Sequence, residues 1–202
     1  MATSTSTVRK SERTRARILD AAAEVFGEQG YSARLVDIAE RAGMKTGSLY
    51  YHFDSREDLV AEILHRGIQT SYDRVREAVE ALPKDAPAID RLASAIRAHT
   101  MSILATGAYA SAQARIVGQV PPAIAKAHQR EQRTYGAYWN RLFEAAQRDG
   151  DIGGDADLFV MRMLALGAMN WIADWLPLAG RRSPESIADA TVGMLLFGAT
   201  RG

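Results

Sequence analysis

The residues between 34 and 59 carry cations, hydroxyl groups and aromatic rings at a spacing suited to contact with a nucleic acid. Two short helical stretches are separated by a glycine, and the second opens on small and hydroxyl-bearing residues. A short helix of that kind can enter the major groove of DNA, where hydroxyl and cationic groups reach phosphates and base edges. The candidate DNA-contacting residues are Arg34, Lys45, Thr46, Gly47, Ser48, Tyr50, Tyr51 and His52.

Several of these residues have a local reason to lie at such a surface. Gly43 permits a tight turn, Thr46 can cap the second helix, and Gly47 leaves room for close approach to DNA. Arg34 adds a long cation at the start of the first helix and is expected to touch a phosphate. The Tyr50 hydroxyl can reach a phosphate, or its ring can instead pack against the protein.

A basic segment precedes this region. It holds five basic residues and one acid, so it carries a net charge of +4, and the rest of the chain carries −3 against a total of +1. Such a segment beside a DNA-reading helix favours phosphate contact, although a solvated helix face is the alternative. The five basic residues are Arg9, Lys10, Arg13, Arg15 and Arg17.

Other kinds of chemistry find little support in the sequence. The chain has no cysteine, and its four histidines show no spacing typical of metal ligands. No nucleophile–base pair or phosphate-binding glycine loop points to an enzyme, and no cofactor is expected. No apolar run approaches the ~18 residues of a membrane span. We therefore expect a cytoplasmic protein without membrane contact, with a disordered tail over residues 1–10.

The elements that must position the candidate residues are all predicted to be helices. With 47% hydrophobic residues in 202, the chain can bury a sizeable core. Apolar residues from Ile18 to Phe26 fall on one helical face that should end at Gly30. Further helices are predicted to begin near Ser55, to run from about 90 to 104, and to occupy a short stretch between Gly107 and Gly118. Three more are predicted after these: one from Pro122 to Arg148, one that begins at Asp155 or Asp157, and one that begins at Ser183.

The run from Asp37 to Leu59 resembles the tetracycline-repressor (TetR) family of regulators. It matches the family's D-I-A helix, its A-G turn, its G-x-L-Y-x-H-F helix and its S-K-E-x-L helix start, with Arg56 in place of the usual lysine. Apolar residues within the run should form a small core. They are Ile38, Ala39, Ala42, Leu49 and Phe53.

The resemblance implies an all-α fold with two domains. An N-terminal three-helix, helix-turn-helix DNA-binding domain would cover residues 11–56, and a larger C-terminal helical domain for ligand binding and dimerisation would cover 57–202. The resemblance also implies that His52 contacts the DNA backbone. The family's usual hydroxyl cap at the first short helix is missing, because Ala33 and Arg34 occupy that place, and Ser32 is the expected substitute.

The predicted helix over residues 157–176 is apolar almost all round. One face carries Leu158, Met161, Ala165, Ala168, Ile172 and Trp175, and the other carries Phe159, Met163, Leu166 and Met169. A helix of this kind must be covered on both sides. In a chain of this size, one side is expected to be covered by a second subunit, and the resemblance implies a homodimer joined by its last two helices.

The segment 167–180 resembles a branch of the family that responds to acyl-coenzyme A. Asn170, Trp171 and Trp175 match that branch's N-W-x-x-x-W pattern, whereas Leu176 replaces a tyrosine and Pro177 comes early. The tryptophans can alternatively be core or interface anchors. The candidate ligand-binding residues are Met101, Leu104, Tyr109, Tyr138, Trp139, Met163, Asn170, Trp171 and Trp175.

These observations predict a ligand-responsive transcriptional repressor. As a homodimer it would bind a palindromic operator in double-stranded DNA and be released by a small hydrophobic effector, an acyl-CoA from lipid metabolism. The alternative within the family is a sensor of drugs or other apolar molecules that controls an efflux gene. An enzyme or a small-molecule carrier is a third interpretation, which no motif supports.

Overall fold

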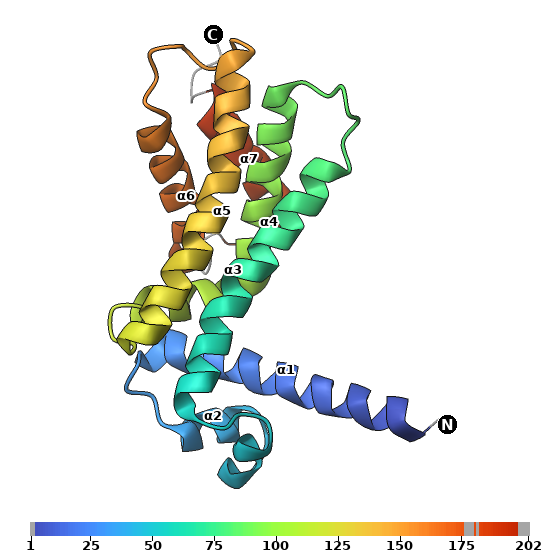
Figure 1. Ribbon diagram of the computed structural model, residues 1–202, viewed down its shortest axis with the longest axis vertical. Coiled ribbons are helices and arrows are strands. Elements are labelled where there is room, and N and C mark those ends of the chain that lie inside the picture. The colour runs from blue at the N-terminus through green and yellow to red at the C-terminus, as the bar shows by residue number, and fades with distance from the viewer. Residues whose placement is uncertain (1–2, 176–179, 181, 198–202) are drawn as a thin grey trace. The chain divides into compact units, whose positions relative to one another are not determined.

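The computed structural model describes residues 3–175, 180 and 182–197, and within these ranges the chain is helical without a strand (Figure 1). None of the helices in this part of the chain is long and apolar enough to cross a membrane. The elements in chain order are α1 (Thr3–Gln29), α2 (Leu35–Arg41), the short 3-10 helix η1 (Thr46–Tyr51), α3 (Arg56–Glu80), α4 (Ala88–Ile116), α5 (Pro122–Arg148), α6 (Leu158–Trp175) and α7 (Pro184–Phe197).

The described residues form two compact units. The first comprises the chain up to Gly67 together with Ala108–Gln129, and the second comprises Ile68–Gly107 and the chain from Arg130 onward. Helices α3, α4 and α5 each contribute to both units. The first unit includes the start of α3, the end of α4 and the start of α5 in addition to the DNA-binding domain expected over residues 11–56.

The core of the first unit is built by α1 and the helices that follow it. The apolar face predicted between Ile18 and Phe26 is buried, which confirms the sequence interpretation. The small core predicted around the turn is also confirmed, since all five of its residues are buried. Ala112 and Ile116 of α4 complete this core.

Helix α1 begins earlier than the sequence suggested and ends where it predicted. Its first residue is Thr3, so the helix starts inside the segment for which we expected a disordered tail. It ends at Gln29, and Gly30 adopts a positive φ of 73°. The Gly30 N–H donates a hydrogen bond to the Phe26 carbonyl oxygen at 2.9 Å, which satisfies one of the last helical acceptors.

Side-chain caps begin three of the later helices as predicted. The Ser55 hydroxyl accepts the Asp58 N–H at 3.0 Å before α3, and the Ser183 hydroxyl accepts an N–H at 3.2 Å before α7. Asp157, rather than Asp155, caps α6 by accepting the Val160 N–H at 3.1 Å. Each cap pairs a backbone N–H that would otherwise lack a helical partner.

The two short helices of the first unit lack such caps, which corrects two expectations. Arg34 precedes α2 and Lys45 precedes η1, and neither side chain forms a capping hydrogen bond. Thr46 therefore does not cap η1. Ser32 instead donates to the Gln29 carbonyl oxygen at 3.4 Å, at the end of α1.

Helix α4 joins two stretches that the sequence pattern separated. It runs through Gly107 with one non-helical residue, Thr106, at φ −132° and ψ 31°. The Thr106 hydroxyl donates to the Ser102 carbonyl oxygen at 2.7 Å, which bonds the side chain to the preceding turn at the kink. Residues beyond the kink belong to the first unit, and residues before it belong to the second.

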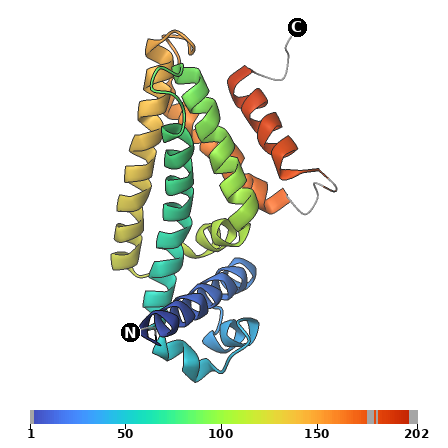
Figure 2. The ribbon, with the colours of Figure 1, turned by 90° about the vertical axis from the view of Figure 1, so that its right-hand side faces the viewer.

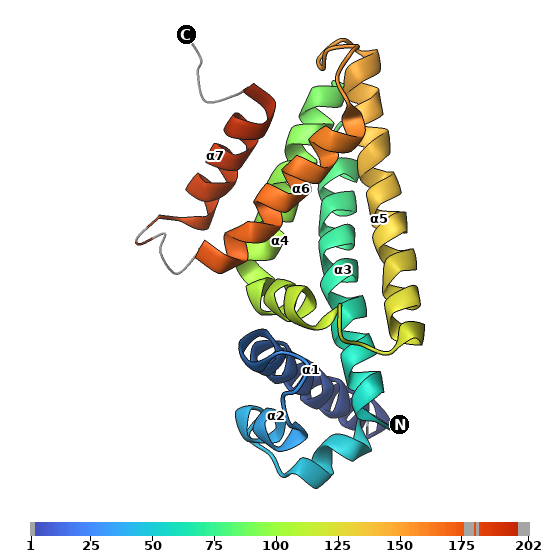
Figure 3. The same ribbon diagram turned by 90° about the vertical axis from the view of Figure 1, so that its left-hand side faces the viewer.

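The apolar core of the second unit is formed by buried residues of α3, α4, α5 and α6, and residues of α7 pack against it. Figures 2 and 3 show α3, α4 and α5 running side by side, with α7 at one side of the group. Trp139 of α5 and Met169 of α6 are fully buried among Leu92, Ile96 and Phe143. The sequence pattern had placed Met169 on the second apolar face of α6, but it packs into the core.

Candidate DNA-binding surface and effector-binding residues

The tight turn between α2 and η1 forms as predicted. Gly43 has a φ of 65°, a conformation that residues with a side chain seldom adopt. Its N–H donates to the Glu40 carbonyl oxygen at 3.0 Å, and the Met44 N–H donates to the Ala39 carbonyl oxygen at 2.9 Å. These bonds fix the direction in which the chain enters η1.

Helix η1 packs one residue into the core of the first unit and exposes several of its candidate DNA-contacting residues. Leu49 is buried, whereas the Tyr50 side chain is 56% exposed and that of Tyr51 is 88% exposed. The exposure of Tyr50 disfavours the alternative in which its ring packs into the protein. Of the remaining predicted contacts, Lys45 and Gly47 are exposed, and Thr46, Ser48 and His52 are half-buried.

Arg34 lies at the surface but is not an unpaired cation. Its guanidinium binds the Asp37 carboxylate through two hydrogen bonds, Nε to Oδ2 at 3.1 Å and Nη2 to Oδ1 at 2.7 Å. This pair lowers the pKa of Asp37 and raises the pKa of Arg34. Contact with a phosphate would therefore compete with Asp37 for the same guanidinium.

Replacing Lys45 by alanine is expected to weaken DNA binding and to reduce its salt dependence by about one phosphate contact. Arg34→Ala should reduce the salt dependence by less, because Asp37 already neutralises part of the Arg34 charge. Fluorescence anisotropy on operator DNA over a series of salt concentrations measures, for each variant, the slope of the logarithm of affinity against the logarithm of salt concentration. An unchanged slope for Lys45→Ala would remove Lys45 from the proposed contact surface.

Arg15 has a structural role that the basic segment did not reveal. Its guanidinium donates a hydrogen bond to the His52 carbonyl oxygen, lies 4.2 Å from the centroid of the Phe53 ring, and approaches the Glu62 carboxylate at 3.5 Å. Arg15 therefore connects α1 with the end of η1 and with α3. The exposed side chains of Arg9, Lys10, Arg13 and Arg17 remain candidates for phosphate contact.

Arg56 ties the start of α3 to the loop between α1 and α2. Its guanidinium donates to the Ala33 carbonyl oxygen at 2.6 Å and to the Tyr31 carbonyl oxygen, and it lies 5.0 Å from the centroid of the Tyr31 ring. Sequence reasoning noted only that Arg56 replaces a lysine. The forked guanidinium can serve two carbonyl oxygens at once, whereas an ammonium group is a compact point charge.

Replacing Arg56 by alanine is expected to lower the free energy of unfolding by about 2 kcal/mol, because two carbonyl oxygens lose a charged donor. Arg56→Lys, which restores the family's usual residue, should lose less. Urea unfolding followed by circular dichroism measures the difference. Equal stability of all three proteins would show that the Ala33 and Tyr31 carbonyl oxygens are satisfied without Arg56.

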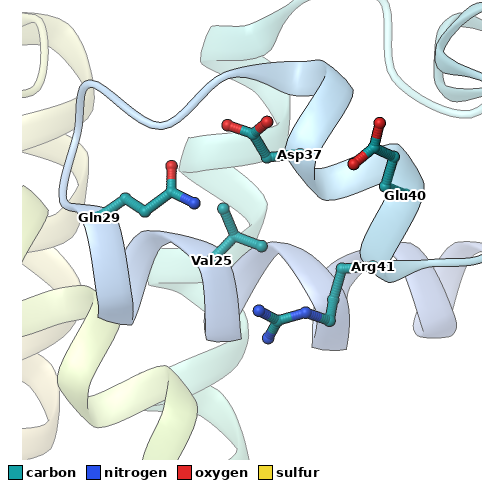
Figure 4. Close-up of a pocket in the computed structure, with 5 residues that line it drawn as sticks. All are labelled: Val25, Gln29, Asp37, Glu40 and Arg41. Carbon is teal, nitrogen blue, oxygen red and sulfur yellow. The ribbon is translucent and has the colours of Figure 1, made fainter.

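An open hollow lies between α1 and α2 on another part of the first unit (Figure 4). It is lined by Val25, Gln29, Asp37, Glu40 and Arg41. Arg41 pairs with Glu24 at 2.8 Å and with Glu28 at 2.9 Å, which raises the pKa of Arg41. Because its one cation, Arg41, is already paired and two carboxylates line it, the hollow does not suit a phosphate. No group of three or more potential metal ligands occurs within the described ranges.

The predicted ligand-binding residues do not gather at one place. Tyr109 lies in the first unit, where its hydroxyl donates to the Asp20 carboxylate at 2.7 Å. In the second unit, Trp139 is buried, whereas Met163 and Trp171 are exposed on α6. The remaining candidates divide into the half-buried Met101, Leu104, Tyr138 and Trp175, and Asn170, which binds His99. Leu176 and Pro177 lie outside the described residues.

Comparison with known proteins connects this arrangement to a family. Residues 18–63 match the family described as bacterial regulatory proteins, tetR family, and residues 85–199 match the tetracyclin repressor-like C-terminal domain. The second match alone covers more than half of the chain. The chain belongs to the TetR family. It is a transcriptional repressor of that family, with a helix-turn-helix DNA-binding domain followed by a helical C-terminal domain.

Proteins similar to this TetR-family chain include repressors named KstR2. It is 33% identical to the transcriptional repressor KstR2 of Rhodococcus jostii (strain RHA1) over 195 residues, which cover 91% of this chain and 90% of that protein. The structure of the ketosteroid transcriptional regulator KstR2 of Mycobacterium tuberculosis shares its fold, with a TM-score of 0.79 at 22% identity, over 93% of this chain and 95% of that one. A tetR-family protein from Rhodococcus RHA1 gives a TM-score of 0.78 at 25% identity, over 92% and 96% of the two chains.

TetR repressors bind operator DNA and small-molecule effectors and usually act as dimers. The family consists of transcriptional regulators and is not known for enzymes. Recognition of the family from residues 37–59 is therefore confirmed, as is the all-α fold. The individual DNA-contacting and ligand-binding residues remain predictions.

Proposed function

We propose that the chain acts as a homodimeric repressor that binds a palindromic operator and is released by an acyl-CoA. The observation that supports dimer formation is a large exposed apolar face on the last two helices. Phe159 of α6 is 62% exposed and Leu164 is 67% exposed, although both are large apolar residues. The face, here called the α6–α7 face, also includes Val160, Met163, Trp171, Met194 and Phe197.

The α6–α7 face is suited to helix packing against a second copy. Soluble monomers rarely expose so many large apolar side chains on neighbouring turns of a helix, as α6 does. Gly167 lies exposed between the turns that carry Leu164 and Trp171, and a Cβ added at Gly167 would meet no atom within 4 Å. A helix of a partner can therefore approach α6 closely at this point.

A two-fold dimer explains why the operator should be palindromic. Each copy would insert one η1 into the major groove, at half-sites separated by roughly 34–36 Å, or one turn of DNA. Within the first unit, α4 packs on α1 closely, because a Cβ added at Gly27 would lie 3.3 Å from the Ser111 Cβ. We propose that an effector that shifts α4 moves α1 through this contact and through the Tyr109–Asp20 hydrogen bond.

The effector is proposed to be an apolar molecule carried as a CoA thioester. The N-W-x-x-x-W match at Asn170, Trp171 and Trp175 supports an acyl-CoA. The relationship to a ketosteroid regulator supports a bulky apolar body, which includes ring systems. An effector that prefers the released state by about 1.4 kcal/mol changes the DNA-binding equilibrium tenfold.

A fluorescence-anisotropy titration tests this function. The protein is titrated on DNA from upstream of its own gene, alone and with oleoyl-CoA, free CoA, oleic acid or progesterone. Release by oleoyl-CoA, but not by free CoA or oleic acid, is the expected result. Release by progesterone alone would indicate that the effector is a ketosteroid and not a CoA thioester. Tight binding that no compound changes would contradict the proposed effector and leave the DNA-binding activity intact.

A further inference from the structure

Arg15 differs from the exposed cations of the basic segment, because its guanidinium makes three contacts within the first unit. Its Nη1 atom donates a hydrogen bond to the His52 carbonyl oxygen, and its Cζ atom lies 4.2 Å from the centroid of the Phe53 ring. Its Nη2 atom lies 3.5 Å from the Glu62 Oε2 atom. Arg17, two residues further along α1, is exposed. Arg15 therefore packs against the protein from within a segment whose other cations face solvent.

The acceptor of the Arg15 hydrogen bond lies at the end of η1. His52 follows Tyr51, the last residue of η1, and its N–H donates to the Leu49 carbonyl oxygen at 2.9 Å. The Phe53 N–H donates to the same oxygen at 3.0 Å. Carbonyl oxygens at the end of a helix have no acceptor role within the helix. Arg15 supplies the donor for one of them, from a helix 37 residues earlier in the chain.

Helix η1 depends on contacts from outside because it is too short to fix its own orientation. It is a 3-10 helix of six residues, and Lys45, which precedes it, forms no capping hydrogen bond. Hydrogen bonds in 3-10 helices have poor geometry, so the surrounding structure must hold such a helix in place. The buried side chains of Leu49 and Phe53 provide two anchors for this stretch. Arg15 provides a third, because it contacts the Phe53 ring and the preceding carbonyl group.

We propose that Arg15 is a positioning residue for DNA recognition, which holds the end of η1 so that Tyr51 and His52 meet the operator in one orientation. Sequence is read through directional hydrogen bonds to base edges, so the reading helix must be oriented. A loose η1 would have to be ordered at the moment of binding, which lowers the affinity. Arg15 thus acts on specificity through His52 and Phe53.

The alternative is that Arg15 contacts a phosphate itself, as we expect of the exposed cations in the basic segment. Its guanidinium would then have to leave the His52 carbonyl oxygen and the Phe53 ring. The carbonyl oxygen would lose a charged donor, which is unfavourable. The two roles differ in the salt dependence of DNA binding, because only a phosphate contact adds to it.

Anisotropy titrations of the full-length protein on two duplexes test the inference. One duplex is DNA from upstream of its own gene, and the other is a shuffled duplex of the same length and composition. Arg15→Ala is expected to lower the affinity for the upstream DNA about tenfold, which corresponds to one charged hydrogen bond. Its affinity for the shuffled duplex should change by less than about threefold, and the salt slope should stay the same. An equal fall of both affinities, with a reduced slope, overturns the inference.

Two matched variants separate charge from position. Arg17→Ala removes the same charge from an exposed position of the same helix, so it should lower both affinities by similar factors. Glu62→Gln removes the ion pair of Arg15 but keeps its contacts with His52 and Phe53. It should bind the upstream DNA almost normally, because both partners of the pair are partly exposed. A loss in Glu62→Gln as large as that in Arg15→Ala overturns the inference.

Amide hydrogen exchange without DNA tests the positioning itself. Residues 45–53 of Arg15→Ala should exchange faster than in the unchanged protein, while the protection of α5 stays the same. Arg15→Lys keeps the charge without the forked guanidinium and should exchange at an intermediate rate, so it provides the same test if Arg15→Ala does not fold. Unchanged exchange of residues 45–53 in both variants overturns the inference. The inference rests on the proposed operator binding, but this measurement needs no DNA, so the failure of either one is distinguishable.

Discussion

Replacing Leu164 by glutamate is expected to turn the dimer into a monomer and to weaken operator binding by about 10²- to 10⁴-fold. Leu164 is the most exposed large apolar residue of α6. In the proposed dimer this residue becomes buried against the partner's copy of the α6–α7 face. Two glutamates, related by the two-fold axis, would then be desolvated near one another without a counter-charge.

The loss of DNA affinity is expected because a monomer no longer joins two copies of η1 that bind two half-sites together. Once one η1 is bound, the second is held near its half-site at a high effective concentration, and avidity exceeds single-site affinity by about 10²–10⁴. A monomer retains η1 but lacks this linkage. Sedimentation velocity measures the oligomeric state, and anisotropy on operator DNA measures the affinity of the same sample.

A matched charge change elsewhere controls for general effects. Ala137→Glu introduces the same charge at an exposed position of α5, outside the α6–α7 face. It should remain dimeric and bind the operator normally. A dimeric Leu164→Glu protein with full operator affinity would show that the α6–α7 face does not join the two copies.

Several helix ends were predicted from sequence because their causes are local. Gly30 ends α1 as predicted, and α5 ends at Arg148 as predicted, with Gly150 at a φ of 85° just beyond it. Ser55 and Ser183 cap the helices that follow them. In each case a residue and its partner lie within four positions in the chain, so the pattern contains all the information that is required.

Interactions between distant segments were not predicted, because spacing along the chain does not determine them. Arg15 reads as one member of a basic segment, but it bonds a carbonyl oxygen 37 residues away. Arg56 likewise bonds the carbonyl oxygens of Tyr31 and Ala33. Tyr109 was named as a candidate ligand-binding residue because large side chains suit an acyl chain, and it lies beyond the kink at Thr106, in the part of α4 that belongs to the first unit.

Acidification is expected to lower the free energy of unfolding by about 3 kcal/mol through His99 alone. The pKa of His99 is lowered from 6.5 to about 4 in the folded protein, chiefly by burial. Between these two values the unfolded chain binds a proton that the folded chain does not. Stability is therefore complete above about pH 6.5 and falls progressively as the pH approaches about 4.

Glutamine at position 99 can keep the hydrogen bonds that His99 forms with Tyr135 and Asn170, without titrating. Its side-chain oxygen can accept the Tyr135 O–H, and its amide N–H can donate to Asn170. Urea unfolding at about pH 7 and about pH 5 should therefore show a smaller loss of stability for His99→Gln than for the unchanged protein. His65→Gln, at an exposed position of α3, should retain the original loss. An identical loss in all three proteins would show that acid unfolding is controlled by other groups. A reduced loss in His99→Gln, with the full loss kept by His65→Gln and by the unchanged protein, would identify the buried imidazole as the group that must stay neutral for the second unit to remain folded.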